Sequence, residues 1–167
     1  MTQTLNISTD TAQRIADMHV GCRVDRAAAV VTGGAEVLFT VTGGDILLTG
    51  FYGEIMVLID SGAGCTLAIN YDADISPNAS VYEDTALGTA SADIDTYVAG
   101  RMIYLPIEGG AMTLTAAGGA CPIDVAPIMV LPPGHFDLTS GAATTLGTIR
   151  WSLWYIPLDA GAKVVSN

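Results

Sequence analysis

Over most of its length the chain alternates apolar and polar side chains with a period of two, and glycine pairs divide this pattern into short runs. A period of two predicts β-strands, because successive side chains of a strand point to opposite faces. In the first run Val37, Phe39 and Val41 share one expected face, and the residues between them share the other. Gly43-Gly44 then supplies a turn into a strand over 46–49, so we expect a hairpin here.

A second hairpin is expected directly afterwards. A glycine-bounded break over 50–53 precedes an apolar face formed by Ile55, Val57 and Ile59. A turn of small residues follows and leads into an alternating run over 65–71. Glycine and serine at such a position favour a tight reversal of the chain. The two runs are therefore predicted to pair with each other.

Four further strands are predicted over 101–107, 111–115, 123–130 and 135–138. The first two flank a glycine pair and are expected to form a third hairpin. Pro122 and Pro127 cannot donate to a ladder of hydrogen bonds, so the third strand should lie at a sheet edge or contain a bulge. Pro133-Gly134 is a good turn signal before the fourth strand.

The clearest strand of all spans residues 148–158. One face carries Ile149, Trp151, Leu153 and Tyr155, and the other carries Arg150, Ser152, Trp154 and Ile156. A strand with aromatic residues on both faces is either central in a sandwich or covered by another subunit. Trp154 beside Arg150 is therefore a candidate interface anchor, with burial in the core as the alternative. Trp151, Trp154 and Tyr155 are expected to hold both the domain and an oligomer.

Counting these runs gives eight or nine short strands and no long helical pattern. The chain is therefore predicted to be all-β, an antiparallel β-sandwich, with a jelly roll as the more specific expectation. Residues 26–167 are assigned to this domain. Within it, residues 72–100 are small and acidic with little periodicity, which predicts a long loop that contacts a partner.

The first 25 residues differ from the rest and are expected to form an N-terminal arm. Asp10 followed by Gln13 resembles a helix capping box, and Ile15 with Met18 gives one short apolar edge. A segment of this length cannot bury a core of its own. It is predicted to become ordered on a neighbouring subunit, through Ile15 and Met18, unless it is a simple edge strand or a frayed lead.

Composition points to association with other proteins. Half of the 167 residues are hydrophobic and only 14% are charged, so few charged groups are left to cover the surface. Some apolar surface is therefore expected to contact other subunits in a homo-oligomer, although a thick core in a monomer would also account for it.

Net charge excludes one class of partner. Six basic residues against seventeen acidic ones give a net charge of −11. A protein that binds nucleic acid needs clustered Lys and Arg, so no nucleic acid is expected as a partner.

The N-terminus lacks the basic start and apolar stretch of a signal peptide, and no run approaches the roughly 20 apolar residues of a membrane span. Neither secretion by that route nor a membrane partner is expected.

No catalytic site or cofactor is predicted. Cys22, Cys65 and Cys121 are odd in number and widely spaced, which indicates buried free thiols in a reducing cytoplasm and neither a disulfide framework nor a zinc site. His19 and His135 lie in no catalytic motif, so structural contacts are the expected role of both.

Two pairs of carboxylates raise the question of calcium. Asp72 with Asp74, and Asp93 with Asp95, could bind Ca²⁺ if backbone carbonyls completed the coordination shell. Calcium needs six or more oxygen ligands, and the EF-hand spacing is absent. Solvated acidic turns are therefore preferred, and no metal site is assigned.

Two stretches resemble structural proteins of tailed bacteriophages. The first is VLFTVTGGDILLTG over 37–50, followed by Gly-Glu-Ile over 53–55. The second is LPPG over 131–134, followed by GTIRWSLWYIPLDAGA over 147–162. The two regions that contain these stretches, 37–55 and 131–162, make up about a third of the chain, and the stretches are strand-and-turn patterns without a catalytic signature.

The resemblance implies a virion protein similar to head decoration or cement proteins. Such proteins typically form trimers and bind the major capsid protein on the capsid exterior, after assembly in the host cytoplasm. The expected activity is therefore structural, not enzymatic. Two alternatives remain: a glycan- or receptor-binding module of a fibre, and a component of the tail or connector.

Overall fold

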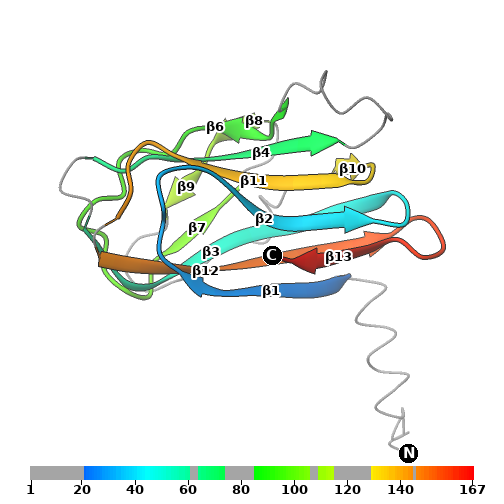
Figure 1. Cartoon of the computed structure of the whole chain (residues 1–167), viewed down its shortest axis with the longest axis horizontal. Coiled ribbons are helices and arrows are strands. Elements are labelled where there is room, and N and C mark those ends of the chain that lie inside the picture. The colour runs from blue at the N-terminus through cyan, green and yellow to red at the C-terminus, as the bar shows by residue number, and fades with distance from the viewer. Residues whose placement is uncertain (1–20, 61–63, 74–84, 106–108, 115–128, 145) are drawn as a thin grey trace, which may run out of the picture.

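The computed structural model describes residues 21–60, 64–73, 85–105, 109–114, 129–144 and 146–167. Within these residues the chain is all-β, and its strands form two antiparallel sheets in a sandwich-like arrangement (Figure 1). This confirms the fold class predicted from the period-two pattern.

The two sheets contain nearly all of the described strands. The path of sheet A is β1 (Cys22–Ala29), β12 (Leu146–Pro157), β3 (Ile46–Asp60), β7 (Met102–Tyr104) and β9 (Thr113–Leu114), with β10 (Met129–Leu131) also paired to β3. The path of sheet B is β13 (Lys163–Ser166), β2 (Gly34–Thr42), β11 (Gly134–Ser140), β4 (Leu67–Ala73) and β5 (Thr85–Ala86). A short parallel pair joins β6 (Gly88–Thr89) and β8 (Gly109–Ala111).

Strand pairing is nested along the chain. Strand β1 pairs with β12, β2 with β11, β3 with β7 and β4 with β5. Early strands therefore pair with late ones, and the chain passes from one sheet to the other at each step from β1 to β4 and again from β11 to β12. Such long-range pairing places β1 and β12 side by side in sheet A, while the C-terminal strand β13 pairs with β2 in sheet B.

The first two predicted hairpins are wrong. Strands β2 and β3 follow each other across Gly43-Gly44, but β2 lies in sheet B and β3 in sheet A. Strand β4 likewise returns to sheet B. Both sheets turn an apolar face to one core, so alternation marks the inward side of each strand without identifying its partner. The third hairpin is confirmed in part, because β7 pairs with β9.

Strand β3 is longer than predicted and irregular. It continues through the expected break over 50–53, and its pairing with β12 contains three register shifts. Two of these shifts lie between Ile55 and Asp60, where Val57 is exposed although Ile55 and Ile59 are buried. A bulge adds a residue to one strand and reverses the alternation beyond it, which explains why the predicted apolar face is incomplete.

A bulge also corrects the predicted face of β2. The register against β11 shifts between Phe39 and Val37, and Leu38 is fully buried beside Phe39. Val37, which was expected to share the face of Phe39, is 39% exposed.

Aromatic side chains from both sheets occupy the centre of the core. The ring of Phe51 lies 5.6 Å from that of Phe136 and 5.5 Å from that of Trp151, and Phe39 meets both phenylalanines edge on. The ring of Tyr71 meets that of Phe136 at 4.9 Å. Aromatic pairs in these geometries add to the stabilisation from burial alone.

The described part of the predicted long loop closes one side of the sandwich. Backbone amides of Ser91 and Ile94 donate to carbonyls at the start of β4 and just before it, and residues 96–101 exchange four backbone hydrogen bonds with Ile55 and Ile59 of β3. Ile94 is fully buried. The segment thus bridges both sheets, while residues 74–84 of the same loop lie outside the described residues.

Candidate binding surfaces

The structure divides the six predicted interface residues into three groups. Arg150 and Trp154 lie on the outer face of sheet A and remain partly exposed. Trp151 and Tyr155 project into the core and are 1% and 6% exposed, so their assignment to an oligomer interface is corrected: they hold the domain. Ile15 and Met18 are outside the described residues.

The boundary of the predicted N-terminal arm also changes. Strand β1 begins at Cys22 and pairs with β12, so residues 22–25 belong to the sandwich. The remaining part of the arm that the structure describes is Gly21 alone, at the start of this strand.

The outer face of sheet A presents aromatic and charged side chains in register. Arg23 is opposite Trp154, and Asp25, Ser152, Tyr52 and Tyr104 form a second row across four strands. Arg150 and Glu54 form a third row and are joined by an ion pair. We call this surface the aromatic face; its members are Arg23, Asp25, Tyr52, Glu54, Tyr104, Arg150, Ser152 and Trp154.

Arg23 is the centre of a polar network on this face. Its Nε donates to Asp25 at 2.7 Å, and its Nη2 donates to the hydroxyl of Ser152 at 3.3 Å. The guanidinium also lies 5.5 Å from the ring centroid of Trp154 and 6.0 Å from that of Tyr52, within the range of a cation–π interaction. One cation therefore orders two aromatic rings and a carboxylate.

Asp25 is held in its charged form by this network. Burial alone would raise the pKa of Asp25, but the hydrogen bond from Ser152, at 2.6 Å, and the adjacent Arg23 outweigh it and lower the pKa below its ordinary value. Asp25 therefore contributes stability above the ordinary aspartate pKa of about 3.9, and this contribution is lost as the pH falls through the lower pKa of the folded state.

Replacing Ser152 by alanine is expected to raise the pKa of Asp25 in the folded protein, because the carboxylate loses its shortest hydrogen bond. The measurement is an NMR titration of the Asp25 carboxyl carbon. Asn70→Ala is the matched control, since it also removes a side-chain hydrogen bond, to Thr139, but on sheet B. An unchanged titration of Asp25 in Ser152→Ala would show that Arg23 alone sets its pKa.

One end of sheet A exposes a run of apolar side chains. Met56, Val57 and Leu58 are consecutive in β3 and are 40%, 49% and 43% exposed. Leu146 of β12, whose register partner is Asp60, is 60% exposed, and Val98 lies beside the same stretch because Tyr97 bonds to Ile59. We call these five apolar residues, Met56, Val57, Leu58, Val98 and Leu146, the end patch.

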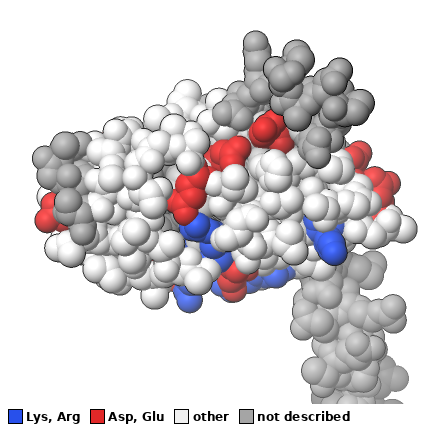
Figure 2. Space-filling view, in the orientation of Figure 1, with Lys and Arg blue, Asp and Glu red and all other residues white. Residues whose placement is uncertain are grey.

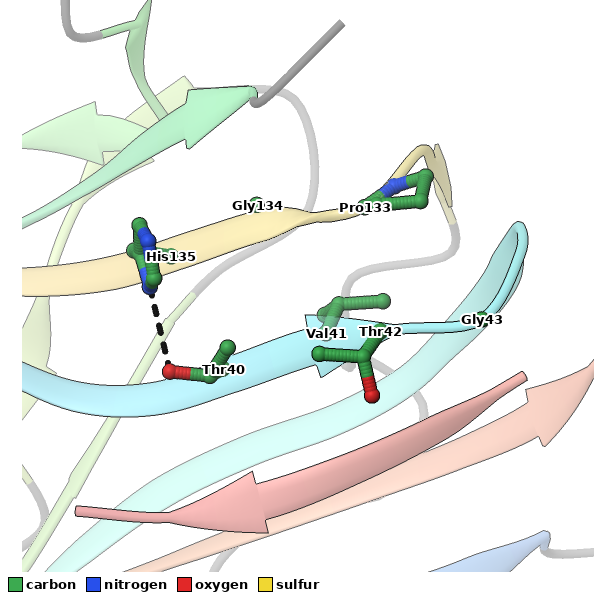
Figure 3. Close-up of a pocket in the computed structure, with 7 residues that line it drawn as sticks. All are labelled: Thr40, Val41, Thr42, Gly43, Pro133, Gly134 and His135. Carbon is green, nitrogen blue, oxygen red and sulfur yellow. Dashed lines mark hydrogen bonds between the residues drawn. The ribbon is translucent and has the colours of Figure 1, made fainter. Parts of the chain in front are cut away.

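The outer face of sheet B is polar. Thr40 and His135 are opposite each other on β2 and β11, and the Thr40 hydroxyl lies 3.0 Å from Nδ1 of His135 (Figure 3). They line a shallow cleft of about 240 Å³ near the Gly43 turn. Asn167 also donates to the Thr40 hydroxyl. His135 thus makes a structural contact, as its position after a turn predicted.

Asp93, Asp95 and Cys65 make structural contacts, whereas Asp74, His19 and Cys121 lie outside the described residues. Oδ1 of Asp93 accepts hydrogen bonds from the backbone amides of Cys65 and Asp95, at 2.7 and 3.0 Å. Asp72 lies at the far end of β4 from this site, opposite His135. In the described part of the chain, no group of three His, Cys, Asp or Glu residues could hold a metal ion. Burial raises the pKa of the Cys65 thiol, which disfavours its reactive thiolate.

Sequence reasoning missed the end patch and most of the aromatic face. The five consecutive apolar residues over 55–59 depart from alternation, and this signal could have identified the exposed run Met56-Val57-Leu58. The link between Arg23 and Trp154 had no such signal, because 131 positions of sequence separate them and only sheet pairing brings them together.

Comparisons with protein-family models, with curated proteins and with solved structures found no match. Among the described residues, no helix has the length and apolar character that would allow it to span a membrane.

Proposed function

We propose that this chain is a structural virion protein that binds the exterior of a phage capsid and stabilises it, as a decoration or cement protein. Its partners are then the major capsid protein and further copies of itself. Each copy contributes binding free energy only in the assembled shell, which shifts the equilibrium toward that shell by mass action. The phage assignment rests on the resemblance of residues 37–50, 53–55, 131–134 and 147–162 to tailed-phage structural proteins.

The end patch is the observation that carries the proposal of a protein-binding role. Consecutive side chains with 40–49% exposure in one strand place apolar surface in water at the bulged end of sheet A. Exposed apolar clusters often mark contacts with other proteins, because removing apolar surface from water on binding is favourable. On a protein that has no binding partner, this exposed apolar surface would lower solubility without any benefit.

Strand order and charge support the same role. The nested pairing, in which β1 meets β12, β2 meets β11, β3 meets β7 and β4 meets β5, supports the proposal of a jelly roll, a fold common in viral capsid proteins. The net charge of −11 favours a position outside a DNA-filled shell. We therefore infer a jelly-roll subunit that faces solvent on one side and the capsid on the other.

Val57→Asp is expected to weaken binding to capsids by about tenfold or more, because it places a charge in the apolar contact. The measurement is co-sedimentation of the purified full-length chain with heads of the phage that encodes it, over a range of chain concentrations. Val165→Asp is the matched control: Val165 is 44% exposed on a strand of sheet B, against 49% for Val57.

Two results would contradict the proposal. If the wild-type chain does not sediment with heads at any concentration, the capsid is not its partner. If Val57→Asp and Val165→Asp weaken binding equally, the end patch is not the contact. Selective loss in Val57→Asp supports both the capsid and the patch.

A glycan- or receptor-binding module is the second candidate, and the aromatic face favours it. Tyr52, Tyr104 and Trp154 are partly exposed on the outer face of sheet A, beside charged groups that could bind sugar hydroxyls. A glycan array separates the two functions. Binding that disappears in Trp154→Ala supports the glycan role, and an array without any signal excludes it for the sugars present.

A further inference from the structure

Strand β1 forms an open edge of sheet A. It pairs with β12 on one side, and among the described residues no strand pairs with its other side (Figure 1). The outward backbone groups of such an edge strand form a template for a strand of another chain. Most of the Lys and Arg surface in Figure 2 lies on this lower side of the molecule, in the region of β1, β12 and β13.

The exposed charges of β1 are self-complementary. Arg23 and Asp25 are two positions apart, so both lie on the outer face of sheet A, and their side chains are 38% and 48% exposed. If a second β1 pairs in the antiparallel direction with Val24 opposite Val24, then Arg23 of each copy faces Asp25 of the other. Each guanidinium would then lie between two carboxylates, one from its own chain and one from its partner.

Neighbouring registers lack this complementarity. A shift in one direction places Arg23 opposite Arg23, and a shift in the other direction places Asp25 opposite Asp25. Like charges directly opposite each other are destabilising, whereas opposite charges stabilise a strand pair. The charges therefore select one register, with a twofold axis through Val24.

Arg26 limits the pairing to the first half of the strand. Its side chain turns toward sheet B, where it forms an ion pair with Glu36 and donates to the carbonyl of Asn167 at 2.8 Å. The register of β1 against β12 shifts beyond this residue. A bulge bends the strand away from a straight edge, so residues 23–26 remain as the regular part.

We propose that β1 is a self-association edge, onto which a second copy of this chain adds its own β1 antiparallel, with Arg23 of each copy facing Asp25 of the other. The occupant is a second copy because the charge sequence of the strand complements itself. The two copies of sheet A then form one continuous sheet. This contact requires no capsid and no residue of the end patch, so it stands independently of the proposed function.

Charge reversal tests the pairing. Arg23→Asp and Asp25→Arg, each alone, put like charges opposite each other at both symmetry-related positions, and each is expected to weaken self-association about tenfold or more. An equimolar mixture of the two variants should associate again, because every facing pair is then opposite in charge. The double variant Arg23→Asp/Asp25→Arg in one chain should also associate. The measurement is sedimentation equilibrium of the full-length chain over a range of concentrations.

Circular dichroism and thermal melting of each variant show whether the sandwich remains folded. Wild-type chain provides the second measurement, which does not depend on any variant: amide hydrogen exchange of residues 23–26 should slow as the concentration rises. Val57→Asp serves as the control for the end patch and should self-associate like the wild type.

The proposal is overturned if the wild type is monomeric at all concentrations. It is overturned equally if the single variants associate as strongly as the wild type, or if their mixture associates no more strongly than either variant alone. If Val57→Asp loses capsid binding but self-associates like the wild type, the result supports both proposals and assigns them to different surfaces.

Discussion

Replacing Trp151 by alanine is expected to lower the free energy of unfolding by about 3–5 kcal/mol, the cost of truncating a large buried aromatic side chain. Trp151 is 1% exposed and packs against Phe51, with ring centroids 5.5 Å apart. Its register partner is Gly53, where an added Cβ would lie 2.7 Å from the indole ring. The indole therefore packs directly on the backbone of Gly53, and its removal would leave a cavity at this place in the core.

Trp154→Ala is the matched control for this prediction. The two tryptophans are three positions apart in β12, but Trp154 lies on the outer face and is partly exposed. Its truncation removes the cation–π contact with Arg23 and leaves no cavity in the core, so we expect less than half of the loss. Urea denaturation of both variants measures the difference. Equal losses would contradict the assignment of the inner and outer faces.

Gly134→Ala is expected to destabilise the sandwich by about 3 kcal/mol, because overpacking against fixed backbone forces the strands apart. A Cβ at Gly134 would lie 2.9 Å from Cα of Ala73 and closer still to the carbonyl oxygen of Asp72. Both atoms belong to the backbone of β4, which pairs directly with β11 at this point. Neither atom can move without disturbing that pairing.

Gly141→Ala separates this clash from a general effect of adding a methyl group. A Cβ at Gly141 would lie 2.8 Å from the hydroxyl of Thr66, which can rotate away. We expect the stability of Gly141→Ala to remain within about 1 kcal/mol of the wild type. Thermal melting of the two variants provides the comparison, and a Gly134→Ala variant as stable as Gly141→Ala would show that β4 and β11 do not approach so closely.

Substitutions on the inner and outer faces of sheet A are expected to have different effects. The inner face carries Ile149, Trp151 and Leu153, where changes act on stability. The outer face and the end patch carry partly exposed groups, where changes should act on association and leave the fold intact. This division gives Trp151 and Trp154, which lie on opposite faces of the same strand, different roles.

Local alternation was sufficient to predict the fold class and several of the strands, although β1, β5, β6 and β13 were not predicted. Runs such as 148–158 show in the sequence which residues share a face, because burial of one face of a sheet requires an apolar residue at every second position. The predicted strand is confirmed, and Ile149, Trp151, Leu153 and Tyr155 share one face as the alternation predicted. The structure shows that this face is the inward one, which the sequence left open because both faces carry aromatic residues. Candidate anchors Arg150 and Trp154 followed from the same alternation, as the residues on the opposite face.

Strand partners depended on the tertiary structure. Alternation is a property of one strand, whereas pairing is a property of two, so the neighbours β2 and β3 were wrongly joined as a hairpin. The contact between Arg23 and Trp154 and the bulges that expose Val57 arise from pairing between segments far apart in the chain. Side-chain spacing thus determined which residues share a face where a strand is regular. Only the packing of two sheets around one core decided which face is inward, where bulges interrupt the alternation and which outward residues lie together.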